Sequence, residues 1–586
     1  MGVRWLGKGF YLKIAWANVR RSKEVYLPYM LAAAIIGGVY FLVVGFSFAQ
    51  GLSGVPGGEN ARMLFSMGVT VFTIFAFCFL FSINRFLIKR RKKEFGLYGV
   101  LGLSKGHVGR ILLWENTIVL FGGLILGIVF ALVFGKLLFL LLLKLMRALP
   151  SLSFSPSPLA YAAVAFLFLA IFFCTSLYNL AQVHLANPIQ LMQSERKGEK
   201  DSRLLWPKAL LGALLLGAAY FFAWTVENSG MAMGIFFLLV LMVIFATYLL
   251  FNAGSIAILR MLRAKKKFYY KPNHFVTISG MFHRMRQNAS SLATICILST
   301  MLTVTLTGTL SLYLGQEQTL RPLHPFDVAF YTGSSDAAPG DDLQALDAAL
   351  YEMAQKRGLA MEANPDKLSY TDYTLDEGVP YPIEGIVVYA DSDLRILSHT
   401  IYRDGILYFD LQGSESECLS FIEDLQLFTQ SRVQDADWDK HYTLISDIFT
   451  DRQDGYGIYG GLLFLGAFFS TLFLSVTVLM LYFKQITEGY EDKDRFAILQ
   501  KVGMDQVQVK KTIDSQVLWV FFLPLAATML HMVFASRILT NMLRAFNLSD
   551  WVLVISCAGG VCLGFAVLYL LAYKLTARVY YRIVKW

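Results

Sequence analysis

Few residues of the chain have the types and spacing that catalysis requires. The 586-residue sequence contains no GxxxxGK[ST] segment, so it has no P-loop whose backbone amides would hold nucleotide phosphates. HExxH, the motif of many zinc proteases, is also absent from the sequence. We therefore expect no catalytic residue, no metal site and no cofactor bound directly by this chain.

The histidines and cysteines have no metal-ligand spacing either. The eight histidines are scattered, and the six cysteines include no CxxC pair. Five of the cysteines fall in apolar segments, which leaves Cys418 alone in a polar region and excludes a disulfide framework. His441 and Asp447 could be combined into a catalytic acid–base pair, but we interpret them as surface residues of the acidic region.

Two ionisable residues stand inside apolar segments, where a charge is costly. We expect Glu115 to satisfy a charge on a neighbouring interfacial or basic stretch; a proton relay is the alternative. We expect His531 to be a neutral, hydrogen-bonded packing residue, with a hinge contact as the alternative. Gly122, Gly123 and Gly127 predict a surface on which two helices approach closely.

The elements that must position these residues are long apolar runs. Hydrophobic residues make up 56% of the chain and charged residues only 16%, which is typical of a polytopic membrane protein. A membrane-spanning helix needs about 20 consecutive apolar residues. The sequence predicts ten spans, at 26–49, 62–88, 111–146, 158–181, 208–226, 231–259, 290–314, 456–483, 515–540 and 551–574.

Charges around the spans are strongly segregated. Lys and Arg gather before the first span and in alternate loops, while the opposite loops are nearly free of them. By the positive-inside rule both termini are cytoplasmic, and the acidic region 315–455 is extracellular. The net charge of +10 therefore reflects membrane topology, and we expect no nucleic-acid partner.

The acidic region has the patterns of a compact α+β domain. Strands are predicted at 327–332, 385–389 and 405–411, and helices at 341–356 and 414–427. Its acidity would attract a cationic peptide, but it is equally what keeps an extracellular domain solvated. We expect a ligand site within 315–455 without assigning its residues. The aromatic residues of this region have two interpretations: they line a ligand-binding groove, or, more simply, they belong to the core and the strands. They are Phe330, Tyr331, Tyr370, Tyr373, Tyr381 and Tyr389.

The order of parts repeats along the chain. FYLKIAWANVRRSKEVYL before the first span and VTISGMFHRMRQNASSL before the seventh have the character of interfacial elbow helices. Each is followed by a span, an outside segment, a second span, an amphipathic cytoplasmic stretch and two further spans. Such internal duplication predicts two half-units that move against each other.

The amphipathic stretch itself occurs twice, as EFGLYGVLGL (Glu94–Leu103) and RFAILQKVGM (Arg495–Met504). Each has an aromatic start, an aliphatic ridge and a glycine at an expected helix end. A basic helix lying on anionic lipid would explain the lysines, but the same residue pattern in both halves favours a groove on a partner protein. The ungapped match pairs Phe95 with Phe496, Gly96 with Ala497, Leu97 with Ile498, and Gly102 with Gly503.

RKKEFGLYGVLGLSKGHV and YFKQITEGYEDKDRFAILQKVGM resemble the cytoplasmic signatures of FtsX-like ABC transporter permeases. Ten spans with one large outside domain between the seventh and eighth resemble the bacitracin-resistance (Bce-type) branch. The resemblance implies that both stretches are coupling helices docking on a separate homodimeric ABC ATPase, which binds the ATP and Mg. Arg495 stands where the first copy has Glu94, so the two contacts need not be equivalent. The implied docking residues are Glu94, Phe95, Gly96, Leu97, Gly102, Phe496, Ala497, Ile498 and Gly503.

The resemblance also implies a permease subunit of a bacterial cytoplasmic membrane. It would remove or export an antimicrobial peptide, such as bacitracin, bound to cell-wall lipid intermediates, and would signal resistance through a sensor histidine kinase. The sequence shows no polar stripe through the spans, which favours dislodging the peptide over moving it through a pore. The alternatives are a sensor scaffold that regulates the kinase, an FtsX-like regulator of cell-wall hydrolases, which usually has four spans, and a lipoprotein-release permease.

The expected fold is a polytopic α-helical membrane protein, with about ten transmembrane helices in two pseudo-repeated FtsX-like units plus one α+β extracellular domain. Membrane lipids surround the spans. The expected parts are an elbow helix at 1–25, a first unit at 26–181 with a coupling helix at 90–108, linkers and spans five and six at 182–287, span seven at 288–314, the extracellular domain at 315–455, and spans eight to ten at 456–586 with a coupling helix at 490–508.

Overall fold

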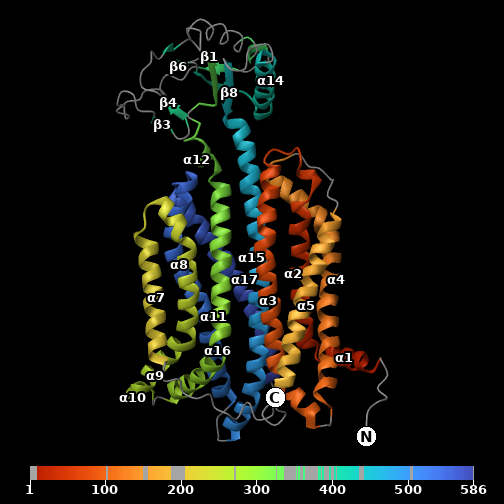
Figure 1. Cartoon of the computed structure of the whole chain (residues 1–586). Coiled ribbons are helices and arrows are strands. Elements are labelled where there is room, and N and C mark those ends of the chain that lie inside the picture. The colour runs from red at the N-terminus through yellow and green to blue at the C-terminus, as the bar shows by residue number, and fades with distance from the viewer. Residues whose placement is uncertain are drawn as a thin grey trace.

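The computed structural model contains ten helices long and apolar enough to cross a membrane, which confirms the predicted spans. The α1 helix and the C-terminal part of α17 lie at one end of the molecule, here named the terminal end, and the strands lie at the other, the domain end (Figure 1). The structure describes residues 9–100, 103–148, 156–185, 205–269, 272–324, 326–334, 352, 354–356, 360–362, 381–383, 386–388, 395–396, 401–403, 406–433, 441–501 and 506–584.

The first unit is a bundle built around α2. Helix α2 (Lys23–Ser47) is buried along most of its length, and it packs against α3 (Gly58–Val100), α4 (Lys105–Leu145) and α5 (Pro158–Leu185). The predicted elbow is a separate helix, α1 (Phe10–Arg21), which the single residue Ser22 divides from α2. A short 3-10 turn, η1 (Gln50–Leu52), lies between α2 and α3.

The second unit repeats this arrangement. Helix α11 (Pro272–Leu314) takes the place of α2 and contacts α15 (Ile448–Lys501), α16 (Gln506–Leu543) and α17 (Trp551–Val584). The 3-10 turn η4 (Arg544–Phe546) follows α16. The second elbow, expected at 276–292, is not a separate helix but the first part of α11, which runs without a break from Pro272 to Leu314 despite Gly280 and Asn288.

An accessory hairpin covers one side of the second unit. It consists of α7 (Leu205–Thr225) and α8 (Ser229–Leu249), and the π-turn η2 (Leu250–Gly254), α9 (Ser255–Ala264) and α10 (Lys266–Tyr269) follow it. Buried His531 of α16 holds this hairpin: its Nδ1 lies 2.6 Å from the Tyr220 hydroxyl and its Nε2 lies 3.1 Å from the Thr247 hydroxyl. His531 is therefore the hydrogen-bonded packing residue that the sequence predicts.

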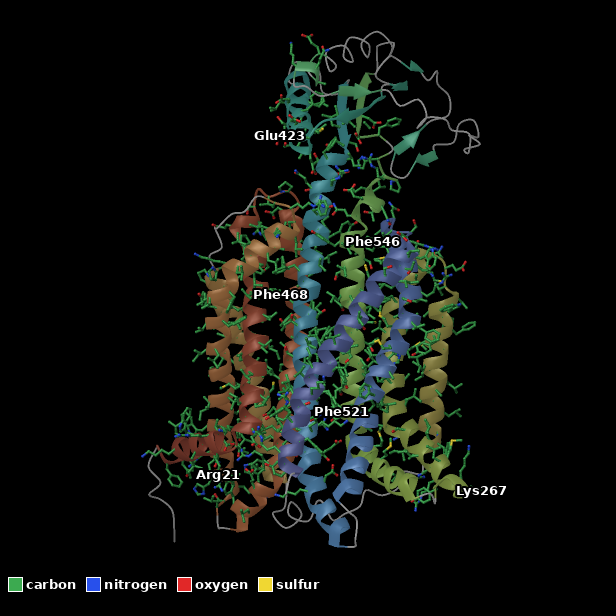
Figure 2. The ribbon with its side chains drawn as sticks, turned by 180° about the vertical axis from the view of Figure 1, so that it is seen from behind. Arg21, Lys267, Glu423, Phe468, Phe521 and Phe546 are labelled. Carbon is green, nitrogen blue, oxygen red and sulfur yellow. The ribbon has the colours of Figure 1, made fainter. Side chains whose placement is uncertain are left out.

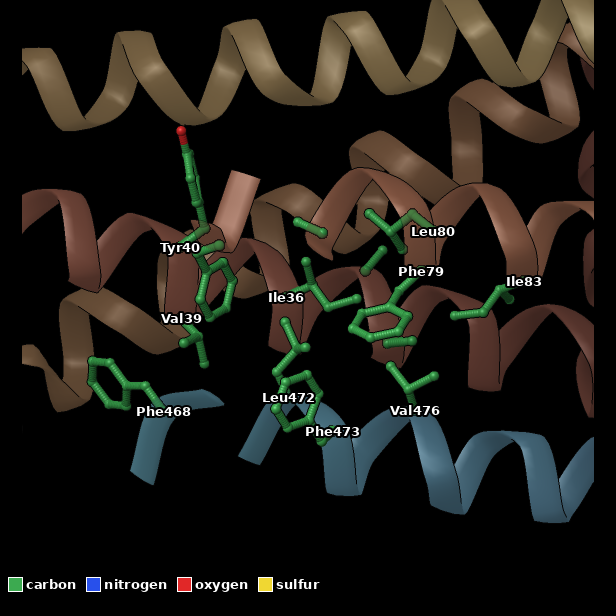
Figure 3. Packing of buried hydrophobic residues seen from close by; sticks show 14 of the residues in the cluster. Ile36, Val39, Tyr40, Phe79, Leu80, Ile83, Phe468, Leu472, Phe473 and Val476 are labelled. Atoms are coloured by element: carbon green, nitrogen blue, oxygen red, sulfur yellow. The ribbon is translucent and has the colours of Figure 1, made fainter. Parts of the chain in front are cut away.

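Phenylalanines join the two units. The ring centroids of Phe72 and Phe469 are 5.4 Å apart, as are those of Phe75 and Phe473. Figure 3 shows Phe468, Leu472, Phe473 and Val476 of α15 directed toward α2 and α3. We name this interface the aromatic seam; its large buried rings make it the main apolar contact between the units.

The turn that leads into α3 meets α15 backbone to backbone. A Cβ atom on Gly457 of α15 would lie 2.5 Å from the Gly57 Cα, and Gly57, the residue before α3, has a positive φ of 67°. Glycine at both positions permits this close approach.

A six-stranded sheet with α14 (Glu415–Val433) forms the domain, which follows α12 (Gln316–Leu320). The strand order is β5-β6-β7-β1-β8, with β2 paired to β7, and all pairings are antiparallel. The strands are β1 (Val328–Ser334), β2 (Ala360–Glu362), β5 (Arg395–Ile396), β6 (Ile401–Arg403), β7 (Ile406–Gln412) and β8 (His441–Asp447); β3 (Tyr381–Ile383) and β4 (Ile386–Val388) form a separate pair.

The predicted strands correspond to β1, β4 and β7, and the helix expected at 414–427 corresponds to α14. The helix expected at 341–356 lies mostly outside the described residues. Buried Cys418, Phe421 and Leu425 pack α14 onto the sheet. The domain ends earlier than predicted, because α15 begins at Ile448 directly after β8 and not at residue 456.

The two coupling helices expected at 90–108 and 490–508 are not independent helices. Helix α3 runs from its span through Val100, and α15 runs through Lys501; the next helices begin at Lys105 and Gln506. The basic residues after each span are good helix formers, so nothing ends the helix at the membrane surface. Each coupling stretch is therefore the projecting end of a membrane helix, followed by a turn.

Two of the three glycines expected at a helix contact are placed there. A Cβ atom on Gly127 would lie 2.4 Å from the Ala34 carbonyl oxygen, and one on Gly123 would lie 2.6 Å from the Ala33 Cβ. Gly122 meets only the Met30 sulfur, at 3.3 Å. The close approach of α2 and α4 thus depends on Gly123 and Gly127.

Gly127→Leu should lower the free energy of unfolding by about 1–3 kcal/mol or more, because the new side chain has no room beside α2. Gly559→Leu in α17 is the matched control, since a Cβ atom at that position would meet nothing within 4 Å. Thermal unfolding of the purified protein in detergent measures both variants. Equal melting temperatures for the two would contradict the close contact of α2 with α4.

Candidate coupling site

The residues predicted to dock are divided by the structure into buried and exposed groups. In the first copy the Phe95 side chain is only 6% exposed and Gly96 is buried, whereas Leu97 is 51% exposed and Glu94 is also exposed. Gly102 lies outside the described residues. Phe95 therefore packs inside the chain in this conformation, and Glu94 and Leu97 form the accessible part of the first stretch.

The second copy is described by its backbone. Phe496, Ala497 and Ile498 lie in the last turns of α15, while their side chains, and all of Gly503, lie outside what the structure describes. The docking role of both copies stays a prediction.

A buried ion pair lies behind the first stretch. Arg91 of α3 donates through its terminal nitrogen to Glu115 of α4 and to the Tyr26 hydroxyl of α2. The Tyr26 hydroxyl donates to Glu115 Oε2 at 2.7 Å. All three residues are at most 4% exposed. We name this cluster, together with Asn18 and Glu94, the first junction.

The first junction reaches both the elbow helix and the exposed stretch. Asn18 of α1 donates to Glu115 Oε1 at 2.8 Å, and Arg91 Nε donates to Glu94 Oε2 at 2.7 Å. The Arg91 guanidinium also lies over the Phe95 ring, 5.5 Å from its centroid. Glu115 thus bonds to both neighbours that the sequence offered it, the elbow and the coupling stretch.

The elbow helix has further contacts on the start of α4. The Tyr11 ring stacks on the His107 ring at a centroid distance of 5.9 Å, and the Arg110 guanidinium lies 5.6 Å from the Tyr11 centroid. Asn18 also donates to the Tyr98 hydroxyl at 3.3 Å. Helices α1, α2, α3 and α4 are therefore tied together at the terminal end, and a displacement of the α3 end acts on all four.

Sequence analysis missed Arg91, Tyr26 and Asn18. The carboxylate of Glu115 indicated that a cation must lie nearby in the fold. All five residues from Lys89 to Lys93 are basic, however, so the sequence does not show which of them is that cation. Only the helical phase of α3 against α4 selects Arg91 among them.

At the terminal end of the second unit, buried polar residues lie at the level that corresponds to the first junction, but their charges differ. In the ungapped match that pairs Phe95 with Phe496, Arg91 aligns with Asp492, which is also buried. Asp492 accepts a 2.7 Å hydrogen bond from the Tyr580 hydroxyl of α17. Lys484 is buried as well, with its amine 5.0 Å from the centroid of the Phe521 ring, which Figure 2 shows on α16. The sign of the buried charge at the aligned position is reversed between the units.

Among the described residues no group of three or more His, Cys, Asp or Glu side chains has a geometry that would hold a metal ion. His441 is the first residue of β8 and Asp447 the last, so they do not form a pair. Burial raises the pKa of Asp447, whose Oδ1 accepts from the Thr450 amide at 2.7 Å and caps α15. The described polar clusters are suited to holding helices together.

The domain joins the membrane helices through a second set of polar contacts. Arg452 of α15 forms two hydrogen bonds with Glu317 of α12, at 2.8 and 3.1 Å, and its carbonyl accepts from the Gln316 amide at 2.7 Å. His324 Nε2 lies 2.7 Å from Asp451 Oδ2. We name this cluster the neck; it joins α12, which Figure 1 shows between α11 and the strands, to the first residues of α15.

Comparison with known proteins finds the same two regions. The FtsX-like permease C-terminal family model matches residues 66–187 and 467–578, and each match contains one coupling stretch. The uncharacterized ABC transporter permease YvcS of Bacillus subtilis is 24% identical over 92% of this chain and 95% of its own length. The permease YxdM of the same organism is 23% identical over 90% and 93%. The bacitracin export permease protein BceB of Halalkalibacterium halodurans is 24% identical over 89% and 92%.

Glu115→Gln should lower the free energy of unfolding by about 3–5 kcal/mol, because it leaves the buried Arg91 without its buried counter-charge. Glu94→Gln, which removes the exposed partner of the same arginine, should cost less than about 1 kcal/mol. Thermal unfolding in detergent gives both values.

The double variant Arg91→Met with Glu115→Met provides the control for local damage. It removes both charges, so it should recover most of the stability lost in Glu115→Gln. If Glu115→Gln is no worse than Glu94→Gln, the ion pair does not hold the first junction together.

Proposed function

We propose that this chain, an FtsX-like ABC transporter permease, is the membrane subunit through which a separate homodimeric ATPase moves the β-sheet domain. The Lys and Arg distribution supports a cytoplasmic terminal end and an extracellular domain. Because the sequence has no P-loop, ATP and Mg bind on the partner. The observation that carries the proposal is the first junction, which joins the exposed end of α3 to three other helices.

The docking face of the first stretch consists of Glu94 and Leu97. A half-exposed leucine beside a carboxylate on a projecting helix end suits an apolar groove with a basic rim. Phe95 acts from within: it packs in the core and lies against Arg91, so it fixes the direction of the helix end.

Helix α15 supports transmission to the domain. It is one helix of 54 residues, about 80 Å long, which connects the second coupling stretch to β8 without a linker. ATP binding on the partner would favour one arrangement of the two stretches, and α15 would carry that bias to the sheet.

The substrate that we propose is an antimicrobial peptide of the bacitracin kind, bound to a cell-wall lipid intermediate. Two relatives carry the name bacitracin export permease protein, and acidic residues outnumber basic ones in region 315–455, which suits a cationic peptide. Removal of the peptide and signalling to a sensor histidine kinase both follow from motion of the domain. A sensor scaffold that only regulates the kinase is the second candidate.

Leu97→Asp should abolish recovery of an ABC ATPase with the tagged permease, because it places a charge in the docking contact. Leu97→Met keeps the apolar surface and should recover the ATPase as the unchanged protein does. The measurement is gentle solubilisation from the native membrane, affinity purification and mass spectrometry. Leu97 is exposed, so folding should be equal in both variants. Recovery of the ATPase with Leu97→Asp would remove this stretch as a docking site.

Inactivating the ATPase partner separates the two candidates. A transporter should then lose protection against the peptide, measured as the inhibitory concentration for the cells, while a sensor scaffold should keep inducing the resistance genes. Normal protection with an inactive ATPase contradicts the proposed function.

A further inference from the structure

The interior of the second unit contains a line of hydroxyl groups. Ser299, Thr303, Thr307 and Ser311 recur every four residues along α11, and each is no more than 1% exposed. On α15, Ser470 and Thr477 are buried at a spacing of seven residues, which keeps them on one face. This line of hydroxyls shows that the expectation of no polar stripe through the spans is wrong. The stripe is hard to recognise in the sequence because single Ser and Thr residues do not interrupt an apolar run.

These hydroxyls divide into two kinds. Ser299 and Thr303 donate to carbonyl oxygens of their own helix, at 2.7 and 3.0 Å, as membrane helices commonly arrange. Thr307, Ser311 and Thr477 have no hydrogen-bond partner among the residues that the structure describes. The Ser470 hydroxyl likewise has no partner among the described residues.

A second observation comes from a different kind of side chain. Gln485, two turns beyond Thr477 on α15, is 1% exposed, and neither its amide nitrogen nor its amide oxygen has a partner within the described chain. At the domain end, Gln316 donates to Arg452 while its own oxygen has no such partner. A primary amide in an apolar interior normally binds something at both ends.

The first unit has the same helix arrangement, but there buried amides bind other side chains. There, Asn84 and Asn179 bind each other at 2.8 Å, and Asn116 donates to Thr175 and Ser176 at 2.9 Å each. The Asn116 amide oxygen and the Tyr29 hydroxyl of the first unit have no partner within the described chain, so it is not fully closed. Side-chain pairs nevertheless join its helices, whereas the buried amide of Gln485 in the second unit pairs with no described group.

Small residues lie at the contact of α11 with α15. A Cβ atom on Gly466 of α15 would lie 2.7 Å from the Thr309 hydroxyl of α11. The side chains that the structure describes around the open hydroxyls give them no hydrogen-bond partner. The group that satisfies them must be small, must both donate and accept, and must have several copies; water has these properties.

We propose that bound water molecules occupy the interior of the second unit, held by Thr307, Ser311, Ser470, Thr477 and Gln485. Each water bridges groups of α11 and α15 that do not reach each other. Hydrogen bonds to water are exchanged at little cost when a helix shifts, whereas direct side-chain pairs must break. The hydrated interface therefore lets α15 move against α11, while the aromatic seam keeps α15 fixed to the first unit. This inference does not depend on the ATPase or the substrate.

Hydrogen–deuterium exchange at single thiols tests the proposal, with D₂O itself as the probe. In a background with the six native cysteines changed to Ala, one cysteine is placed at Thr477 and, separately, at the adjacent Val476, which belongs to the aromatic seam. The infrared S–H band reports exchange in the full-length protein. Thr477→Cys should exchange on the order of tenfold faster or more, because Val476→Cys must wait for local opening. Equal rates, or retention of both bands, would overturn the proposal.

The change in melting temperature caused by Thr477→Val is an independent test of the proposal. Valine has nearly the shape of threonine, so it removes the hydroxyl without creating a cavity. If the hydroxyl is bound to water, the melting temperature should stay equal or fall; if the interior is dry, removing an unsatisfied hydroxyl should raise it. A clear rise would contradict bound water at Thr477.

Discussion

The continuity of α15 is the constraint on which the rest of the structure depends. Its 54 residues form one unbroken hydrogen-bonded ladder, so its two ends and its several faces cannot be set independently. One face supplies Phe469 and Phe473 to the aromatic seam, another supplies Ser470 and Thr477 to the second unit, and the first residue follows β8 directly. A rotation or shift of this helix is felt at the coupling stretch, at both units and at the sheet.

The two units share their helix arrangement but not their interior chemistry. The first is closed at the terminal end by the Arg91–Glu115 pair and deeper inside by asparagine pairs. The second has Asp492 where the first has Arg91 and Gln485 where the first has Asn84, and several of its interior hydroxyls have no partner among the described residues. The two units therefore share a helix arrangement that direct side-chain bonds hold in the first and, in our proposal, exchangeable bonds to water hold in the second. That proposal makes the first unit the fixed part and the second the moving part.

Sequence alone predicted the spans well, because an apolar run of sufficient length has few alternatives in a membrane. It also predicted the role of Glu115, since a single buried carboxylate requires a partner. It did not identify Arg91, and it assigned Phe95 to the surface, because the phase of a helix against its neighbours decides which residue of a basic or apolar run turns inward. The coupling stretches were expected as separate helices, although nothing in their sequences ends the preceding helix. The hydroxyls were missed because each is small and stands between strongly apolar neighbours.

The neck has a consequence for how such a protein can change over evolutionary time. Both chain crossings into the domain, at α12 and at the start of α15, are fastened to each other by the Arg452–Glu317 pair and by Gln316. The strands and α14, the described elements between the crossings, form an inserted module. With the proposed function, substitutions, insertions or a complete exchange of that module would alter ligand recognition, while the bundle would keep its packing. Ligand specificity and the ATP-driven motion would then diversify separately, and chimeras joined at the neck would transfer one without the other.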